Sequence, residues 1–131
     1  MGQQQLLLIV LSVIIVGIAV VVGINMFNSQ AASSNLEAVT NDLLNLAARA
    51  QQYYVKPTGM GGGGNSFADL TIQHLTAKTS NDNGTYSLGT VASDQVQIIG
   101  IGTMDGDDVA GNCEATVTVY EDSVRTAVGN R

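Results

Sequence analysis

Charged residues are scarce in this chain of 131 residues, and positive charge is scarcer than negative charge. They make up 12% of the sequence, with five Lys and Arg against eleven Asp and Glu, for a formal net charge of −6. An ordinary globular domain has about 25% charged residues, and a protein that binds nucleic acid needs a face of Lys and Arg. The composition therefore excludes nucleic acid as a partner and indicates that part of the chain does not face water.

Cysteine and histidine occur once each, as Cys113 and His74. One cysteine cannot form an intrachain disulfide, and neither residue belongs to a Cys/His spacing that binds zinc, haem or an iron–sulfur cluster. His74 also has no Ser or Cys nucleophile in a recognisable motif beside it, so we interpret it as a surface or loop residue. We expect neither a cofactor nor an enzymatic activity.

The first charged residue of the chain is Glu37, and a long apolar run precedes it. Fourteen of the seventeen residues from Leu6 to Val22 are Leu, Ile or Val. At roughly −0.4 kcal/mol each, they gain on the order of −6 kcal/mol on entering a bilayer, and the run is long enough to span it. A secretory signal peptide is the alternative, but the first five residues lack its Lys or Arg. We expect residues 1–27 to form the transmembrane or filament-core half of a helix.

The chain becomes polar after Phe27, and apolar residues then recur at helical spacings of three and four. These residues are Leu36, Val39, Leu43, Leu46, Ala50 and Tyr53. No Pro separates the two stretches, so we predict one helix from about Gln3 to Tyr54, roughly 75 Å long. Pro57 and the glycine-rich run 59–64 end it. We expect residues 28–56 to be an amphipathic half that packs on a globular head.

Residues 57–131 are expected to form a loop and a small antiparallel sheet, which makes the fold class α+β. Strands are predicted at 85–88, 96–101, 114–120 and 124–128 from their alternating pattern. In the third, Val117 and Val119 share one face with Ala115, and we predict that they face the helical stripe at Leu43, Leu46 and Ala50. Asn83-Gly84 is a turn signal. Ser66 and Asp69 match a capping box for a short helix through about Leu75, and a loop is the alternative.

This layout resembles the type IV pilin superfamily: an apolar segment fused to an amphipathic helix, then a loop and an antiparallel sheet. The resemblance implies a leader cut just before the apolar segment and a Glu at the fifth mature position that pairs with a neighbour's terminal amine. Here Met1-Gly2 is either a short leader or already the mature start. In the second case Gln5 occupies the place of that Glu, and its pairing would be a neutral hydrogen bond.

The resemblance implies a non-enzymatic structural subunit that is held in the inner membrane, then polymerises with identical copies into an extracellular filament with the help of an assembly machinery. Independently of the family, such an apolar helix needs cover once it leaves a bilayer, and a bundle of identical helices supplies it. Small residues such as Gly17 would let these helices approach closely. The expected filament-core residues are Leu6, Leu7, Leu8, Ile9, Val10, Leu11, Val13, Ile14, Ile15, Val16, Gly17, Ile18, Val20, Val21 and Val22.

Two further alternatives for the function stay open, a pseudopilin or minor pilin of a secretion system and a monomeric single-pass membrane protein whose head binds a partner. Two candidate sites in the head also have alternatives. Asp105, Asp107 and Asp108 give an oxygen-rich loop of the kind that holds Ca²⁺, but without the full EF-hand spacing, so a solvated hairpin loop competes. Asn83-Gly84-Thr85 matches a glycosylation acceptor, or serves only as a turn.

Overall fold

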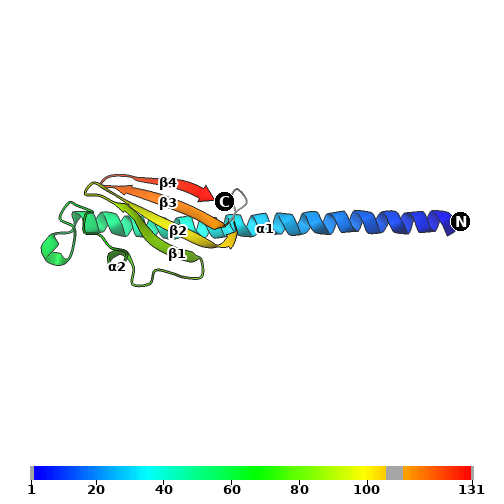
Figure 1. Cartoon of the computed structure of the whole chain (residues 1–131), viewed down its shortest axis with the longest axis horizontal. Helices are drawn as coiled ribbons and strands as arrows, with labels where there is room; N and C mark the ends of the chain where they lie inside the picture. The colour runs from blue at the N-terminus through cyan, green and yellow to red at the C-terminus, as the bar shows by residue number, and fades with distance from the viewer. Residues whose placement is uncertain (1, 106–110, 131) are drawn as a thin grey trace. The chain divides into compact units, whose positions relative to one another are not determined.

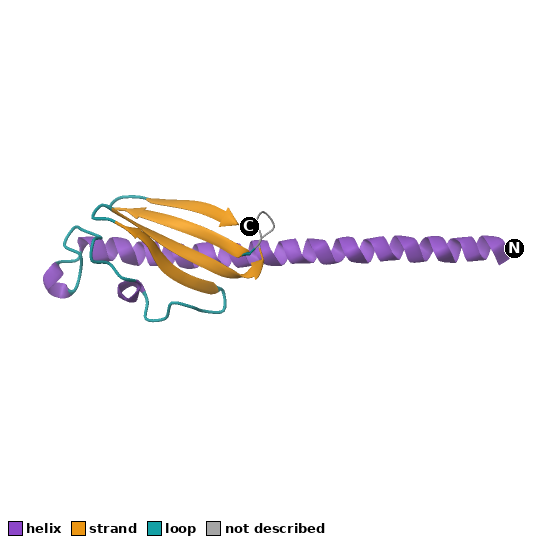
Figure 2. Cartoon of the chain, in the orientation of Figure 1, coloured by secondary structure: helices purple, strands orange, loops and turns teal. Residues whose placement is uncertain are grey.

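The computed structural model describes residues 2–105 and 111–130, and Figures 1 and 2 show its elements. The chain divides into two compact units, residues 1–31 and 32–131. The order of elements is helix α1 (Gly2–Val55), the 3-10 helix η1 (Thr58–Met60), helix α2 (Ile72–Leu75) and strands β1 (Gly84–Val91), β2 (Gln95–Asp105), β3 (Asn112–Tyr120) and β4 (Val124–Asn130). The predicted α+β class is confirmed.

Helix α1 runs from Gly2 to Val55 as one element, as the absence of Pro predicts. Its C-terminal carbonyl groups find partners in the glycine-rich segment that follows. The backbone N–H groups of Gly63 and Asn65 donate to the carbonyl oxygens of Tyr53 and Tyr54, at 2.8 and 2.6 Å. The last carbonyl groups of a helix lack partners within the helix, so this segment caps α1 while it reverses the chain direction.

The four strands form one antiparallel sheet in the order β1-β2-β3-β4, which is the predicted meander. Ile98 lies opposite Val117, and Val96 lies opposite Val119, so the apolar residues of β2 and β3 share one face. The buried positions of β3 alternate along the strand. Val117 and Val119 are fully buried, whereas Thr116 and Thr118 stay partly exposed, so the predicted register is confirmed.

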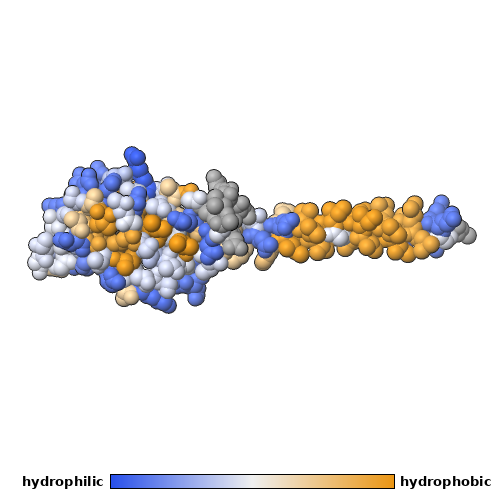
Figure 3. Space-filling model, in the orientation of Figure 1, coloured by the Kyte–Doolittle hydropathy of each residue, from blue (hydrophilic) through white to orange (hydrophobic). Residues whose placement is uncertain are grey.

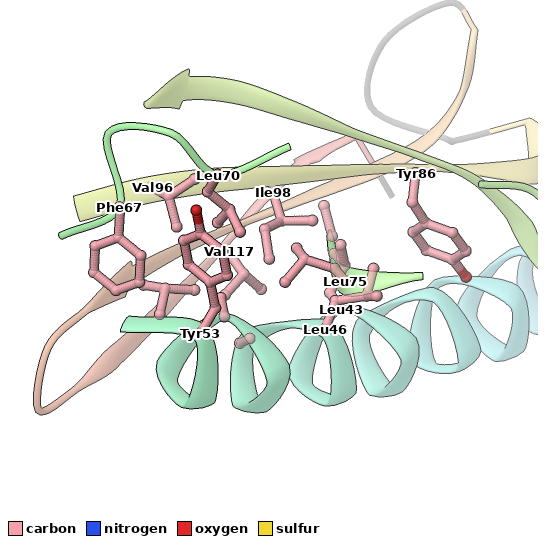
Figure 4. Close-up of a cluster of buried hydrophobic side chains, with 14 of the residues drawn as sticks. Leu43, Leu46, Tyr53, Phe67, Leu70, Leu75, Tyr86, Val96, Ile98 and Val117 are labelled. Atoms are coloured by element: carbon pink, nitrogen blue, oxygen red, sulfur yellow. The ribbon is translucent and has the colours of Figure 1, made fainter. Parts of the chain in front are cut away.

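The hydrophobic core of unit 32–131 lies between the sheet and the second half of α1. Figure 4 shows Leu43, Leu46 and Tyr53 of α1 within this cluster, together with Ile98 and Val117 of the sheet. Phe67, Leu70 and Leu75 complete it from the segment between α1 and β1. The core thus covers the apolar stripe that the sequence predicted.

Two glycines of β2 allow α1 to lie close to the sheet. A Cβ atom on Gly100 would come within 2.7 Å of Val39 Cγ1. On Gly102 it would come within 2.1 Å of Asn35 Oδ1 and 2.4 Å of Cys113 Sγ. Contacts this short force the neighbouring side chains to shift, which a packed interior resists, so glycine is favoured at these two positions.

One of two local predictions needs revision. Helix α2 begins only at Ile72, and its capping box is formed by Thr71 and His74, so Ser66 belongs to a preceding loop, where its hydroxyl accepts from the backbone N–H of Ala68. The turn signal at Asn83-Gly84 is confirmed, since the chain bends just before β1. The side chain of Asn81 stabilises this bend, because its Oδ1 atom accepts from the backbone N–H groups of Asn83 and Gly84.

Candidate functional site

The most distinctive feature of unit 1–31 is an uncovered apolar helix surface, which we define as residues 6–27. Each Leu, Ile, Val, Met and Phe side chain in this range is 49–73% exposed. Figure 3 shows apolar residues over almost all of the visible face of this stretch. By length and composition, α1 is the one helix in the described part of the chain that can cross a membrane. All fifteen predicted filament-core residues lie on this surface.

The apolar helix surface has a shallow groove on one side at Gly17. No heavy atom lies within 4 Å of the point where a Cβ of this glycine would stand. The groove is lined by Val13, Ile14, Gly17, Ile18, Val21 and Val22. A helix approaching on this side would meet the backbone more closely than elsewhere, which is the way small residues promote helix association.

The apolar helix surface has only two polar side chains, Ser12 and Asn25. The hydroxyl of Ser12 donates to the carbonyl oxygen of Leu8 at 2.7 Å, within the helix. Such back-bonding removes the need for water or a partner chain at this serine. Gln5, the candidate for pairing with a neighbour, is exposed just before the apolar run begins. Nothing on this helix half therefore opposes a fully apolar environment between Leu6 and Val22.

Three polar residues of α1 form hydrogen bonds to other segments of the head. They recur every seven positions, as Asn35, Asp42 and Arg49. This spacing places them on one side of the helix. The Oδ1 atom of Asn35 accepts from the backbone N–H of Thr103 at 2.9 Å and from the thiol of Cys113 at 3.1 Å. Its Nδ2 atom donates to a backbone carbonyl in the segment before β1. Sequence analysis missed this set, although the seven-residue spacing beside the apolar stripe signals it.

Asp42 gathers three donors at a single carboxylate oxygen. Asn81 Nδ2 and Asn83 Nδ2 each donate to its Oδ2 atom at 3.0 Å, and the hydroxyl of Tyr86 donates to the same atom. Burial raises the pKa of Asp42, but the hydrogen bonds from Asn83, Tyr86 and Asn81 together outweigh it and hold the pKa below its usual value. Burial and the same hydrogen bond raise the pKa of Tyr86. This network fixes the segment before β1 to the helix.

Asn83 forms two hydrogen bonds that join the segment before β1 to α1. Its Nδ2 atom, which would carry a glycan, donates to Asp42, and its backbone carbonyl accepts from Asn35 Nδ2 at 2.8 Å. The side chain is half-buried between these partners. A glycan would replace one of the two N–H groups of this nitrogen, so only one would remain for the hydrogen bond to the carboxylate.

The remaining candidate residues do not assemble into a chemical site. Of the proposed calcium ligands, Asp105 ends β2, and Asp107 and Asp108 lie outside the described residues. Among residues 2–105 and 111–130, no group of three or more His, Cys, Asp or Glu could hold a metal ion. Cys113 is buried, and its burial raises the pKa of the thiol, so it is held as a protonated hydrogen-bond donor.

The other side of α1 holds the connection between β3 and β4. Gln51 Nε2 lies 3.4 Å from the carbonyl oxygens of Tyr120 and Ser123, to which it donates. The hydroxyl of Tyr54 donates to Glu121 Oε2 at 2.8 Å, and this bond raises the pKa of the tyrosine. Loops at both edges of the head are therefore tied to the same helix.

In comparisons with known proteins, no family model, curated protein or solved structure matches this chain. A long apolar N-terminal helix followed by a small antiparallel sheet is compatible with a pilin-like protein.

Proposed function

We propose that this chain is a structural subunit that polymerises through its apolar helix surface into an extracellular filament resembling a type IV pilus. One observation supports this function above all. Residues 6–27 expose their apolar side chains all round the helix, while the apolar stripe of residues 32–53 is buried by the chain's own sheet.

The first half of α1 needs cover that its own unit does not provide. Monomeric soluble proteins rarely expose an apolar patch larger than roughly 300–600 Å². A bilayer covers the apolar helix surface before assembly. Outside the bilayer, the same surface on a second copy of the chain can cover it. Burying the two apolar surfaces against each other is favourable. The groove at Gly17 supports close packing between such helices.

The decisive variant is Val16→Lys, in the middle of the apolar run. On the insertion scale a central Lys costs about 2.5–3.5 kcal/mol, against roughly −6 kcal/mol gained by the run, so the variant should still enter the membrane. Among packed helices the ammonium would be buried without a partner at every subunit, which costs several kcal/mol each time. We expect the variant in the membrane fraction at the wild-type level, with no filaments in sheared cell-surface material.

Val16→Ile is the matched control, because it keeps the apolar character and should leave filaments intact. Filaments at the normal level from Val16→Lys cells would contradict the proposal. Abundance in the sheared material separates the alternatives. A major subunit is plentiful there, a pseudopilin or minor pilin is scarce, and a monomeric single-pass protein stays with the membrane in wild-type cells.

A further inference from the structure

One pocket of the head is lined by two cations and no carboxylate, and we call it the basic pocket. It has a volume of about 350 Å³ and is lined by Arg49, Gln52, Tyr53, Lys56, Gly61, His74 and Leu75. Two of the five Lys and Arg residues of the chain are thus in one place. Arg49 Nη1 donates to the carbonyl oxygen of Leu75 at 2.7 Å, which orients the guanidinium group. A guanidinium group has five N–H donors, so donors remain for a partner.

The ring groups of the basic pocket are held in place within the head. The imidazole of His74 lies 4.9 Å from the ring of Tyr53, between centroids. Its Nδ1 atom accepts from the backbone N–H of Thr71 at 3.0 Å, which holds the ring in the lining that it shares with Arg49 and Lys56. The pocket therefore presents two exposed cations on a rigid base, suited to carboxylates.

A second pocket of the head has the opposite sign, and we call it the acidic pocket. It has a volume of about 330 Å³ and is lined by Asp94, Tyr120, Glu121, Asp122, Ser123 and Arg125. Three carboxylates face one cation there, and that cation, Arg125, lies 5.7 Å above the ring of Tyr120. The three carboxylate side chains are exposed, and Glu121 is oriented by its hydrogen bond from Tyr54.

The two pockets are on opposite sides of α1. Arg49 belongs to the basic pocket, and Gln51 holds the turn that carries the acidic pocket. At 100° per residue these two positions are about 200° apart around the helix. The head therefore presents a positive pocket at one side and a negative pocket at the other.

We propose that the basic pocket of one head receives the acidic pocket of the next copy of this chain. This inference rests on the proposed polymerisation. Contact between identical pockets would bring like charges together, whereas contact between opposite pockets joins different surfaces of the two copies. Such a heterologous contact leaves one pocket open at each end and continues into a row. Exposed ion pairs are individually weak, so this contact sets the register of the heads and adds to the association of the helices.

The chain offers a direct chemical test, because Lys56 and Lys78 are its two lysines. A carbodiimide joins a lysine amine to a carboxylate only where the two touch. Treatment of native filaments should give a ladder of dimers, trimers and longer chains, with Lys56 joined to Glu121 or Asp122 in the mass spectrum. A contact between identical pockets would give no such ladder, because the basic pocket has no carboxylate and the acidic pocket has no lysine. In Lys56→Arg the charge remains but the amine is gone, so the ladder should vanish while the filaments persist.

Charge-reversal variants test the same contact without a cross-linking reagent. Lys56→Glu and Asp122→Lys should each weaken the head contact about fivefold or more at 0.1 M salt, because attraction becomes repulsion. The double variant restores opposite charges and should recover filament yield and resistance to shear. Lys78→Glu and Asp82→Lys are the matched controls, because they make the same charge changes at exposed residues outside both pockets.

The outcomes separate the two proposals. If wild-type cells make no polymer, the proposed function fails and the head contact fails with it. If polymer forms but the ladder runs through Lys78, stops at dimers or is absent, the head contact alone is wrong. Failure of the double variant to recover, with both controls normal, leads to the same conclusion.

Discussion

Val16 and Val39 are the same residue on the same helix, yet Val16 is 60% exposed and Val39 is fully buried. Helical propensity and side-chain chemistry are identical at the two positions. The difference comes from residues far along the chain, since β2 and β3 cover Val39 and no described residue buries Val16. The two halves of α1 therefore differ in burial: the chain itself covers the apolar stripe of residues 32–53 and leaves the side chains of residues 6–27 exposed.

Deleting the uncovered half should have the largest effect. A chain of residues 32–131 keeps the whole core and the buried Ala32, so we expect it to be folded, soluble and monomeric. Analytical ultracentrifugation and circular dichroism measure both properties. The full-length chain in the same buffer without detergent is the control and should sediment as a polymer or aggregate. A truncated head that polymerises by itself would place the main interface outside the apolar helix surface.

Placing one Lys in each half should separate folding from assembly. In Val39→Lys, an unpaired ammonium enters the core beside Gly100, and we expect a loss of about 3–5 kcal/mol, a large part of the roughly 5–15 kcal/mol that stabilises a typical domain. Val16→Lys should leave thermal unfolding of the head unchanged in detergent. Thermal denaturation of both full-length variants, followed by far-UV circular dichroism of the strand signal, checks this. Equal destabilisation by the two variants would refute the division of α1.

Much of this division is readable from the sequence. An apolar run without charge and a stripe with spacings of three and four are different patterns on one helix, and the alternation around Val117 fixes which face of β3 is buried. The proposed filament function remains a prediction.

Other features depend on contacts between distant segments, which no local pattern encodes. Asn35 meets Cys113 across 78 positions of sequence, and Gly102 has to be a glycine because that pair occupies the space where its Cβ would stand. The turn at Asn83-Gly84 could be predicted, but a further reason for the glycine could not. A Cβ on Gly84 would come within 2.2 Å of the carbonyl oxygen of Ile101. The two charged pockets likewise combine residues from α1 with residues from loops far away.

The covered half of α1 should be sensitive to single methyl groups at the sheet. In Gly102→Ala the new Cβ overlaps Asn35 Oδ1 and Cys113 Sγ, and we expect a loss of about 1–3 kcal/mol from overpacking. Gly129→Ala, also in a strand, is the matched control, since its Cβ would find its nearest neighbour at 3.8 Å. Urea denaturation of both variants of the 32–131 chain gives the difference. If Gly102→Ala were as stable as Gly129→Ala, α1 would not lie as close to β2 as the structure shows.

The smallest expected effect concerns how pH changes the stability that the hydrogen bonds of Asp42 contribute between α1 and the segment before β1. The pKa of Asp42 is below its ordinary value of 3.8 in the folded head. A carboxylate with a depressed pKa stabilises the fold above its unfolded pKa, and this stabilisation is lost as the pH falls through the folded value.

In Asp42→Asn, the negative charge that accepts hydrogen bonds from Asn81, Asn83 and Tyr86 is absent at every pH. We expect the variant to be less stable by about 1.5 kcal/mol at pH 7, the lower end for hydrogen bonds to a charged group. The gap between wild type and variant should narrow as the pH falls below 3.8 and should close once the pH is below the depressed folded pKa of Asp42. Urea denaturation of the two chains from pH 2 to pH 7 measures the gap, with Asp82→Asn as the control at an exposed loop position. A gap that stays constant down to pH 2 would mean that packing of the side chain, and not its charge, joins the helix to this segment.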